Sequence, residues 1–161
     1  MAELEGKTAL ITGAGRGIGQ AIALAYAREG ANLSLAARSV AELEETAAEC
    51  WKFGAEVLIT PTDVTDVGQV ERLAAATIER YSTIDILVNN AGIGGPVGVL
   101  EGNDLDAWID TIQINLIGLY LCCRAVVPVM KRQNSGRIVN LSGAGAANAW
   151  AWLVYTSPSP P

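Results

Sequence analysis

A run of glycines near the N-terminus has the residue types and the context of a phosphate-binding loop. Glycine lets the backbone approach a pyrophosphate closely, and a helix N-terminus offers free N–H groups and the positive end of its dipole. A glycine-rich string alone could be a flexible surface turn, but this one lies between an apolar, β-branched run and a segment with helical spacing, which favours dinucleotide binding. The residues expected to contact the cofactor are Thr12, Gly13, Gly15, Arg16, Gly17, Ile18 and Gly19.

A second polar segment, Asn89-Asn90-Ala91-Gly92, comes directly after another apolar run. Read by itself it is a polar turn. Ligands of open α/β sheets, however, bind at the carboxyl ends of strands, and this segment falls at such an end. We therefore expect it to take part in binding.

The glycine spacing Gly13-x3-Gly17-x-Gly19 together with residues 89–92 resembles the short-chain dehydrogenase/reductase family, over residues 6 to about 155. The resemblance implies that residues 89–92 brace the central sheet, with cofactor contacts from Asn90, Ala91 and Gly92. It also implies that Asp63 and Val64 lie against the adenine. Asp63 has a simpler alternative role as a turn or helix-cap residue.

The charges at the end of the second strand predict which cofactor binds. Binders of NAD place an acid there to accept hydrogen bonds from the ribose 2′-hydroxyl. Here the segment 35–38 contains no acid and ends in Arg38, which can pair with a 2′-phosphate, and Arg16 can reach the same group. These residues favour NADP(H) over NAD(H). The alternative is that both are solvated surface cations.

The resemblance also implies a catalytic set, with Asn115, Ser142 and Tyr155 at the family positions. In that family the Tyr phenol is the general acid and base, the Ser hydroxyl holds the substrate oxygen, and the Asn holds a water through its helix backbone. Gly143 stands where many relatives have a second Ser, so the register of Ser142 could differ by one.

The Lys that the family places four residues after the Tyr is missing, because Ser159 stands there and Pro158 would disrupt the helix. That Lys would lower the pKa of the phenol towards working pH. Domains of this class commonly run to about 200–250 residues. We therefore expect residues 156–161 to be a cut or frameshifted end, and the chain to be catalytically impaired.

Apolar strands alternating with helices must position these residues. The alternation predicts right-handed βαβ units, hence a single α/β domain over residues 1–161, a Rossmann-type doubly wound parallel sheet in three layers, truncated after about the fifth strand. Two capping boxes, Ser39 with Glu42 and Asp66 with Gln69, open two helices, and residues 106–131 form a long apolar helix. The expected strands, buried on both faces, are 8–12, 32–36, 56–60, 84–89 and 137–141.

Composition excludes several classes of protein. The 161 residues are 50% hydrophobic and 17% charged, with a net charge of −6 and no His. We expect no nucleic-acid partner, no His-based mechanism and no metal site. The three Cys are expected to be buried thiols of a cytoplasmic protein. Residues 112–130 are apolar enough to be considered as a transmembrane helix, but the polar residues among them favour a buried core helix.

These observations predict an NADP(H)-dependent oxidoreductase that interconverts a carbonyl and a secondary alcohol on a small molecule, for example a 3-oxoacyl thioester. The resemblance implies a homo-oligomer in the full-length parent. Two alternatives remain: a non-catalytic module that binds NADP(H), and a non-functional gene fragment.

Overall fold

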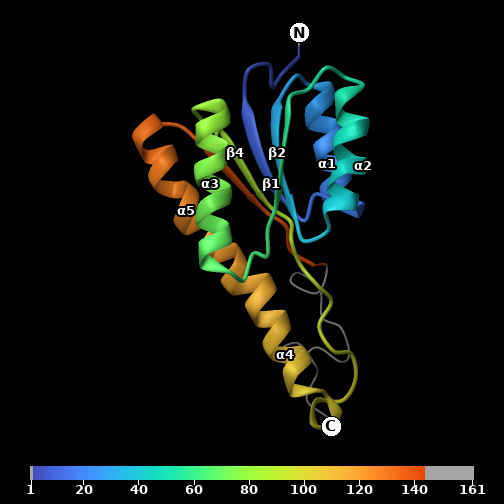
Figure 1. Ribbon diagram of the computed structural model, residues 1–161. Helices are drawn as coiled ribbons and strands as arrows, with labels where there is room; N and C mark the ends of the chain where they lie inside the picture. Colours follow the sequence, from blue (N-terminus) through green and yellow to red (C-terminus); the bar gives the residue numbers. More distant parts are fainter. Residues whose placement is uncertain (1, 144–161) are drawn as a thin grey trace.

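The computed structural model describes residues 2–143, and these form one parallel sheet with helices on both faces (Figure 1). The strands lie in the order β3-β2-β1-β4-β5, so the order reverses between β1 and β4. The strands are β1 (Thr8–Thr12), β2 (Asn32–Ala37), β3 (Val57–Pro61), β4 (Ile86–Asn89) and β5 (Arg137–Asn140). This is the Rossmann-type α/β fold that the sequence predicts.

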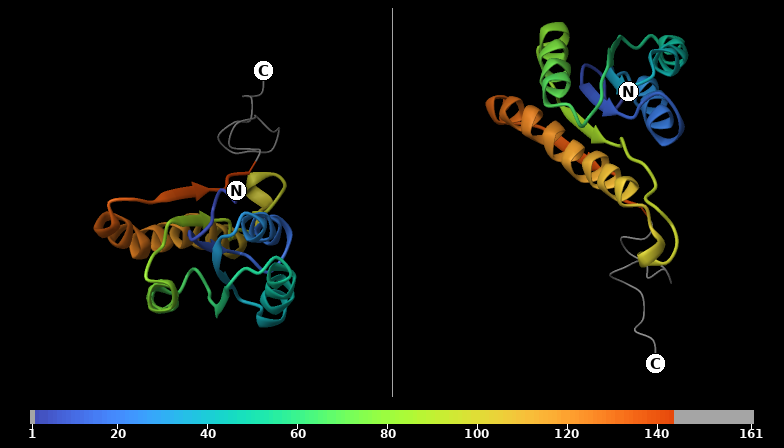
Figure 2. Two further views of the ribbon diagram at one scale, coloured as in Figure 1. Left: turned by 90° about the horizontal axis from the view of Figure 1, so that it is seen from above. Right: turned by 60° about the horizontal axis from the view of Figure 1, so that its bottom comes forward.

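The helices are α1 (Gly17–Arg28), α2 (Val40–Trp51), α3 (Val67–Tyr81), α4 (Leu105–Ile112) and α5 (Leu119–Gln133). Helices α1 and α2 cover one face of the sheet, and α3 and α5 cover the other (Figures 1 and 2). Alternate side chains of β1 supply both cores: Leu10 packs on the α3 side and Ile11 on the α1 side.

Both predicted helix caps are confirmed. The Ser39 hydroxyl accepts a hydrogen bond from the Glu42 N–H at 3.3 Å, and Asp66 accepts one from the Gln69 N–H at 2.9 Å. The main-chain N–H of Gln69, with its side-chain amide, holds the pKa of the Asp66 carboxyl below its ordinary value. In a full capping box the Gln69 side chain would also accept a hydrogen bond from the Asp66 N–H. Here it accepts one from the Asp63 N–H instead.

The expectation that all five strands are buried on both faces is wrong for β3 and β5. Strands β1 and β2 are buried, whereas β3 is half-buried and β5 is exposed along its length. The reason is position, since β3 and β5 form the two edges of the sheet in the described part of the chain. Strand β5 therefore presents an open edge.

The predicted long helix is continuous from Leu105 to Gln133, with a π-helical segment at Gln113–Gly118 between α4 and α5. Its length and hydropathy would suffice to span a membrane, although its second half packs into the core of the domain. Helix α4 projects away from the sheet, has no buried residue and leaves Leu105, Ile109 and Ile112 exposed (Figures 1 and 2).

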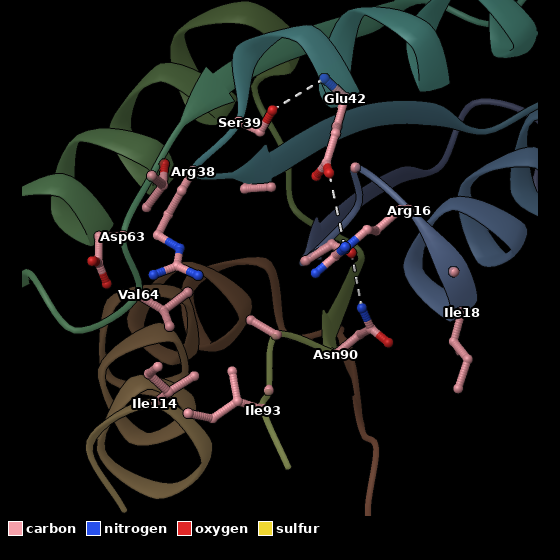
Figure 3. Close-up of a pocket in the computed structure, with 17 residues that line it drawn as sticks. Arg16, Ile18, Arg38, Ser39, Glu42, Asp63, Val64, Asn90, Ile93 and Ile114 are labelled. Atoms are coloured by element: carbon pink, nitrogen blue, oxygen red, sulfur yellow. Dashed lines mark hydrogen bonds and ion pairs between the residues drawn. The ribbon is translucent and has the colours of Figure 1, made fainter. Parts of the chain in front are cut away.

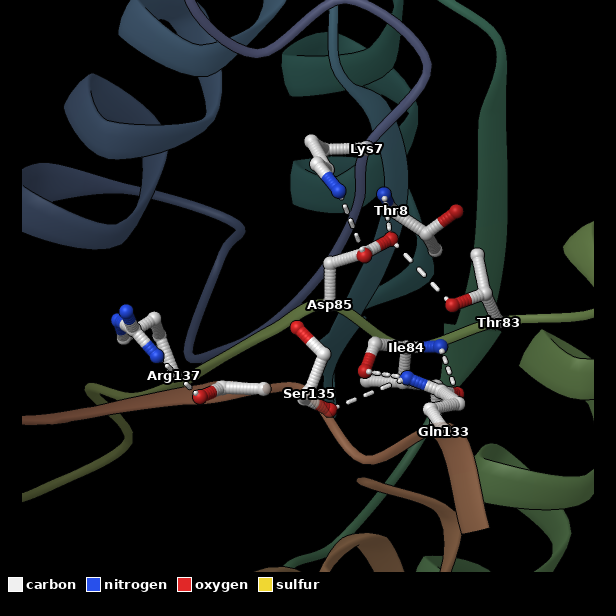
Figure 4. A network of polar contacts seen from close by, with 9 residues as sticks. Lys7, Thr8, Thr83, Ile84, Asp85, Gln133, Ser135 and Arg137 are labelled. Atoms are coloured by element: carbon white, nitrogen blue, oxygen red, sulfur yellow. Dashed lines mark hydrogen bonds and ion pairs between the residues drawn. The ribbon is translucent and has the colours of Figure 1, made fainter. Parts of the chain in front are cut away.

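Polar contacts fix the amino ends of the central strands (Figure 4). The Asp85 carboxylate accepts hydrogen bonds from the Thr8 N–H at 3.0 Å and from the Lys7 ammonium at 3.2 Å. The Gln133 side chain, at the end of α5, donates to the Ile84 carbonyl and accepts from the Ile84 N–H, both at 3.1 Å. These bonds tie β1, β4 and α5 together at the amino ends of the strands. The carboxyl ends of the strands, on the opposite side of the sheet, remain free for a site.

Candidate functional site

A cavity of about 570 Å³ opens at the carboxyl edge of the sheet, where the strand order reverses (Figure 3). Its volume lies in the usual range for a small-molecule or cofactor pocket. It is lined by Gly13, Gly15, Arg16, Gly17, Ile18, Ala37, Arg38, Ser39, Glu42, Thr62, Asp63, Val64, Asn90, Ala91, Gly92, Ile93 and Ile114. Every cofactor residue expected from the sequence is in that set except Thr12 and Gly19.

The glycine loop gives the cavity a floor of bare backbone. A side chain at Gly13 would stand 2.8 Å from the Asn90 amide nitrogen, and one at Gly19 would collide with the Gly13 carbonyl. Gly17, by contrast, faces open space and has a φ of +59°. No side chain caps α1 at Arg16, so the first turn of the helix meets the cavity with its own N–H groups. Such a cradle fits a pyrophosphate.

Thr12 and Asn90 join the glycine loop to the segment after β4. The buried Thr12 hydroxyl donates to the Val88 carbonyl at 3.3 Å and accepts from the N–H groups of Asn90 and Ala91, each at 3.1 Å. The Asn90 amide donates to the carbonyls of Thr12 and Gly13 at 3.0 and 3.1 Å. Thr12 therefore supports the cavity floor without lining the cavity, whereas Asn90 both lines the cavity and holds the glycine loop in place.

Asp63 and Val64 form a side wall after β3 (Figure 3). The Asp63 carboxylate accepts hydrogen bonds from the N–H and the hydroxyl of Thr65 at 2.9 and 2.8 Å, so it closes a tight turn while it lines the cavity. The true cap of α3 is Asp66. Val64 packs against Gly118, where a Cβ would stand 2.7 Å from its side chain.

Asn115 lies within the π-helical segment, and both ends of its amide are occupied. Its oxygen accepts from the Ile93 N–H, and its nitrogen donates to the Ile93 carbonyl, each at 2.9 Å. The side chain therefore ties the helix to the loop after Gly92 rather than reaching into the cavity. The preceding residue in the chain, Ile114, lines the cavity.

Ser142 is exposed and follows β5, whose Asn140 accepts a hydrogen bond from the Asn89 amide at 2.8 Å. Tyr155 lies outside the described residues. The structure thus does not bring Asn115, Ser142 and Tyr155 together as a described group.

Sequence reasoning missed six lining residues: Ala37, Ser39, Glu42, Thr62, Ile93 and Ile114. Position along the chain could have found all but Ile114, because Ala37 ends β2 and the others follow the carboxyl ends of β2, β3 and β4 within a few residues. Glu42 is the one with chemical consequence, since its carboxylate lies 3.9 Å from the Arg16 Nε.

The cysteines are separate from the cavity. Burial raises the pKa of Cys50 to about 11 and that of Cys122 to about 12, so both remain neutral thiols at physiological pH. Cys123 is half-buried and accepts a hydrogen bond from the Asn89 amide at 3.3 Å. Within residues 2–143 no group of three Cys, Asp or Glu side chains could hold a metal ion.

Comparison with known proteins gives one consistent result. The model of the family described as short chain dehydrogenase matches residues 7–158. The 3-oxoacyl-[acyl-carrier-protein] reductase of Synechocystis sp. is 38% identical over 143 residues, which make up 88% of this chain and 58% of that protein. The chain therefore spans less than two thirds of the length of this relative.

Two solved structures show the same fold with a cofactor. An NAD⁺-bound xylitol dehydrogenase has a TM-score of 0.87 and 34% identity, with 91% of this chain and 56% of that chain covered. A variant of actinorhodin polyketide ketoreductase with NADPH has a TM-score of 0.85 and 34% identity, with 97% and 58% covered.

Proposed function

The chain belongs to the short-chain dehydrogenase family, and from that premise we propose that its cavity binds NADP(H) for hydride transfer between a carbonyl and a secondary alcohol. The observation that carries the proposal is the bare-backbone cradle of Gly13, Gly17 and Gly19 at the switch point of the sheet. The pyrophosphate binds there at the N-terminus of α1.

The choice of NADP(H) over NAD(H) follows from two cations in the cavity lining. Arg38 follows β2 directly, and Arg16 is the residue that immediately precedes α1. Guanidinium groups bind phosphate with charge-assisted, often bidentate hydrogen bonds. The structural relatives include both an NAD⁺-bound and an NADPH-bound protein, so they do not distinguish the two cofactors. The support for NADP(H) therefore comes from the charges of Arg16 and Arg38 in this chain.

The remaining contacts follow from the cavity walls. Asp63 and Val64 hold the adenine end, while Ala91 and Gly92 line the path of the ribose towards Ile93. When bound, the nicotinamide donates or accepts the hydride. The protein's part is to orient that ring, exclude water and manage the proton of the substrate oxygen.

Ser142 and Tyr155 are the proposed residues for that oxygen, with the phenol of Tyr155 as general acid and base. Asn115 acts through the main chain, since Ile93 occupies both ends of its side-chain amide. Ser159 stands where a Lys would lower the pKa of the phenol. Reduction of carbonyls, for example of 3-oxoacyl thioesters, is therefore expected to be impaired in this chain by at least about a thousandfold.

We propose that the protein is cytoplasmic and that it self-associates. The exposed apolar residues of the long helix support the self-association. Leu105, Leu116 and Tyr120 are 72%, 57% and 58% exposed, although their types are those of a protein interior. A second copy of the chain is the partner we propose for this surface. Size-exclusion chromatography tests it, with a dimer or larger species expected.

The test of the proposed function combines binding and turnover. Calorimetric titration with NADPH and NADH is expected to show one site per chain that binds NADPH more tightly. Oxidation of NADPH with a panel of ketones is expected to be slow. Binding without any turnover would favour a non-catalytic binding module, and a chain that binds neither cofactor would be a non-functional fragment.

A further inference from the structure

A carboxylate lies in the cavity beside the cations proposed for the 2′-phosphate. Glu42, in the first turn of α2, lines the cavity, and its Oε1 is 3.9 Å from the Nε of Arg16 (Figure 3). The capping-box pattern predicts that this side chain turns back to the N-cap. It instead points across to the glycine loop.

The packing of α2 on that loop fixes the position of Glu42. One turn further along the helix, the buried Thr46 hydroxyl contacts the carbonyls of Ala14 and Gly15, each at 3.1 Å. A side chain at Gly15 would stand 2.8 Å from the Glu42 Cβ, so the stem of Glu42 lies directly on the glycine. Its backbone is held by the Ser39 cap. The carboxylate thus stays near Arg16.

Arg16 is the more exposed member of the pair. Its side chain is 85% exposed, against 40% for Glu42, and it makes no hydrogen bond that would cap α1. Arg38 differs, because it forms no ion pair with any residue of the described chain. A 2′-phosphate can therefore pair with Arg38 directly, whereas pairing with Arg16 requires that Arg16 leave the Glu42 carboxylate.

We propose that Glu42 is a specificity-determining residue, which competes with the cofactor 2′-phosphate for Arg16 and so reduces the preference for NADP(H) over NAD(H). This role rests on the proposed function. A cofactor without the phosphate leaves the Arg16–Glu42 pair intact. Removing the negative charge at position 42 strengthens binding of the phosphorylated cofactor alone.

The experiment measures dissociation constants for NADPH and NADH by calorimetry on the whole chain. Glu42→Gln keeps the shape of the side chain and the Ser39 cap while it removes the charge. Exposed ion pairs are weak, so the expected gain in NADPH affinity is about two- to fivefold. NADH affinity stays within about 1.5-fold. In an Arg16→Gln background the same change at Glu42 has a smaller effect.

Glu44→Gln is the matched control, because Glu44 lies on the same helix, is exposed and does not line the cavity. It is expected to change neither affinity. Adenosine 2′,5′-bisphosphate, which lacks the nicotinamide half, is expected to show the same gain with Glu42→Gln as NADPH. Circular dichroism checks that each variant is folded.

Three results would contradict the role of Glu42. They are an unchanged ratio of the two affinities in Glu42→Gln, a loss of NADH affinity with NADPH unaffected, and an equal gain in the Glu44→Gln control. A wild-type chain that binds neither cofactor would instead overturn the proposed function. The two failures are therefore distinguishable in a single set of titrations.

Discussion

The Thr12 hydroxyl is the smallest group on which the geometry of the cavity depends, and Thr12→Val removes it without changing the shape of the side chain. The hydroxyl makes three hydrogen bonds in a fully buried position: to the Val88 carbonyl and from the N–H groups of Asn90 and Ala91. A net contribution of about 0.5–1.5 kcal/mol for each of the three bonds gives a loss of about 1.5–4.5 kcal/mol in the free energy of unfolding.

The same change also loosens the loop that lines the ribose path. We expect NADPH affinity to fall about tenfold, equal to about 1.4 kcal/mol. Urea denaturation followed by circular dichroism measures the first effect, and calorimetric titration of the folded variant measures the second. Thr12→Ser is the matched control, because it keeps the hydroxyl and loses one methyl group, at a cost of about 0.8 kcal/mol.

Unfolding of Thr12→Val at the same urea concentration as the parent chain would show that the hydroxyl does not stabilise the fold. The same would follow if Thr12→Ser were as unstable as Thr12→Val, since the methyl group and not the hydroxyl would then be responsible. A stability loss with unchanged NADPH affinity would separate the two claims: it would confirm the hydrogen bonds and reject the link from the loop to the cofactor.

Three further predictions concern charge, backbone and thiols. Arg38→Asp is expected to weaken NADPH about ten- to a hundredfold and to spare NADH, by loss of a charge-assisted phosphate contact; equal losses in titrations with both cofactors would count against it. Gly17→Val is expected to abolish binding, because Gly17 lines the cavity and its φ of +59° is one that a β-branched residue rarely adopts; an NADPH titration with parent affinity would contradict this. Burial raises the pKa of Cys50 to about 11 and that of Cys122 to about 12, above the ordinary thiol value of 9, so the unfolded chain loses these protons first and the free energy of unfolding falls as pH rises from 9 towards 11 and 12. Cys122→Ala is therefore expected to flatten the fall of unfolding free energy between pH 9 and 12, and an unchanged slope in urea titrations would refute the burial argument.

The sequence predicts the central strands well because their signal is local. Strand β1 begins and ends where its apolar, β-branched run does, and the caps at Ser39 and Asp66 depend on residues three positions apart. Burial of β3 and β5 could not be predicted, since edge position depends on strand order.

In the candidate site too, residues with a local sequence signal could be predicted, and residues placed by contacts distant in sequence could not. The glycines carry their own signal, because only a bare backbone fits beside the Asn90 amide and the Gly13 carbonyl. The spacing from Ser39 predicts that Glu42 is half of a capping box, whereas its turn towards Arg16 depends on a contact with Gly15 that is distant in sequence. The orientation of the Asn115 amide likewise depends on its hydrogen bonds to Ile93, 22 residues away.

The central claim is that a nicotinamide dinucleotide binds across the glycine loop at the carboxyl edge of the sheet. Amide chemical shifts in ¹⁵N-labelled protein test it directly, because each glycine reports its own surroundings. Addition of NADPH is expected to shift the amides of Gly13, Gly17 and Gly92 and to leave Gly30 and Gly54 unchanged, since these two precede β2 and β3 at the opposite edge. A spectrum in which the three cavity glycines do not move, or in which Gly30 and Gly54 move instead, would contradict the account.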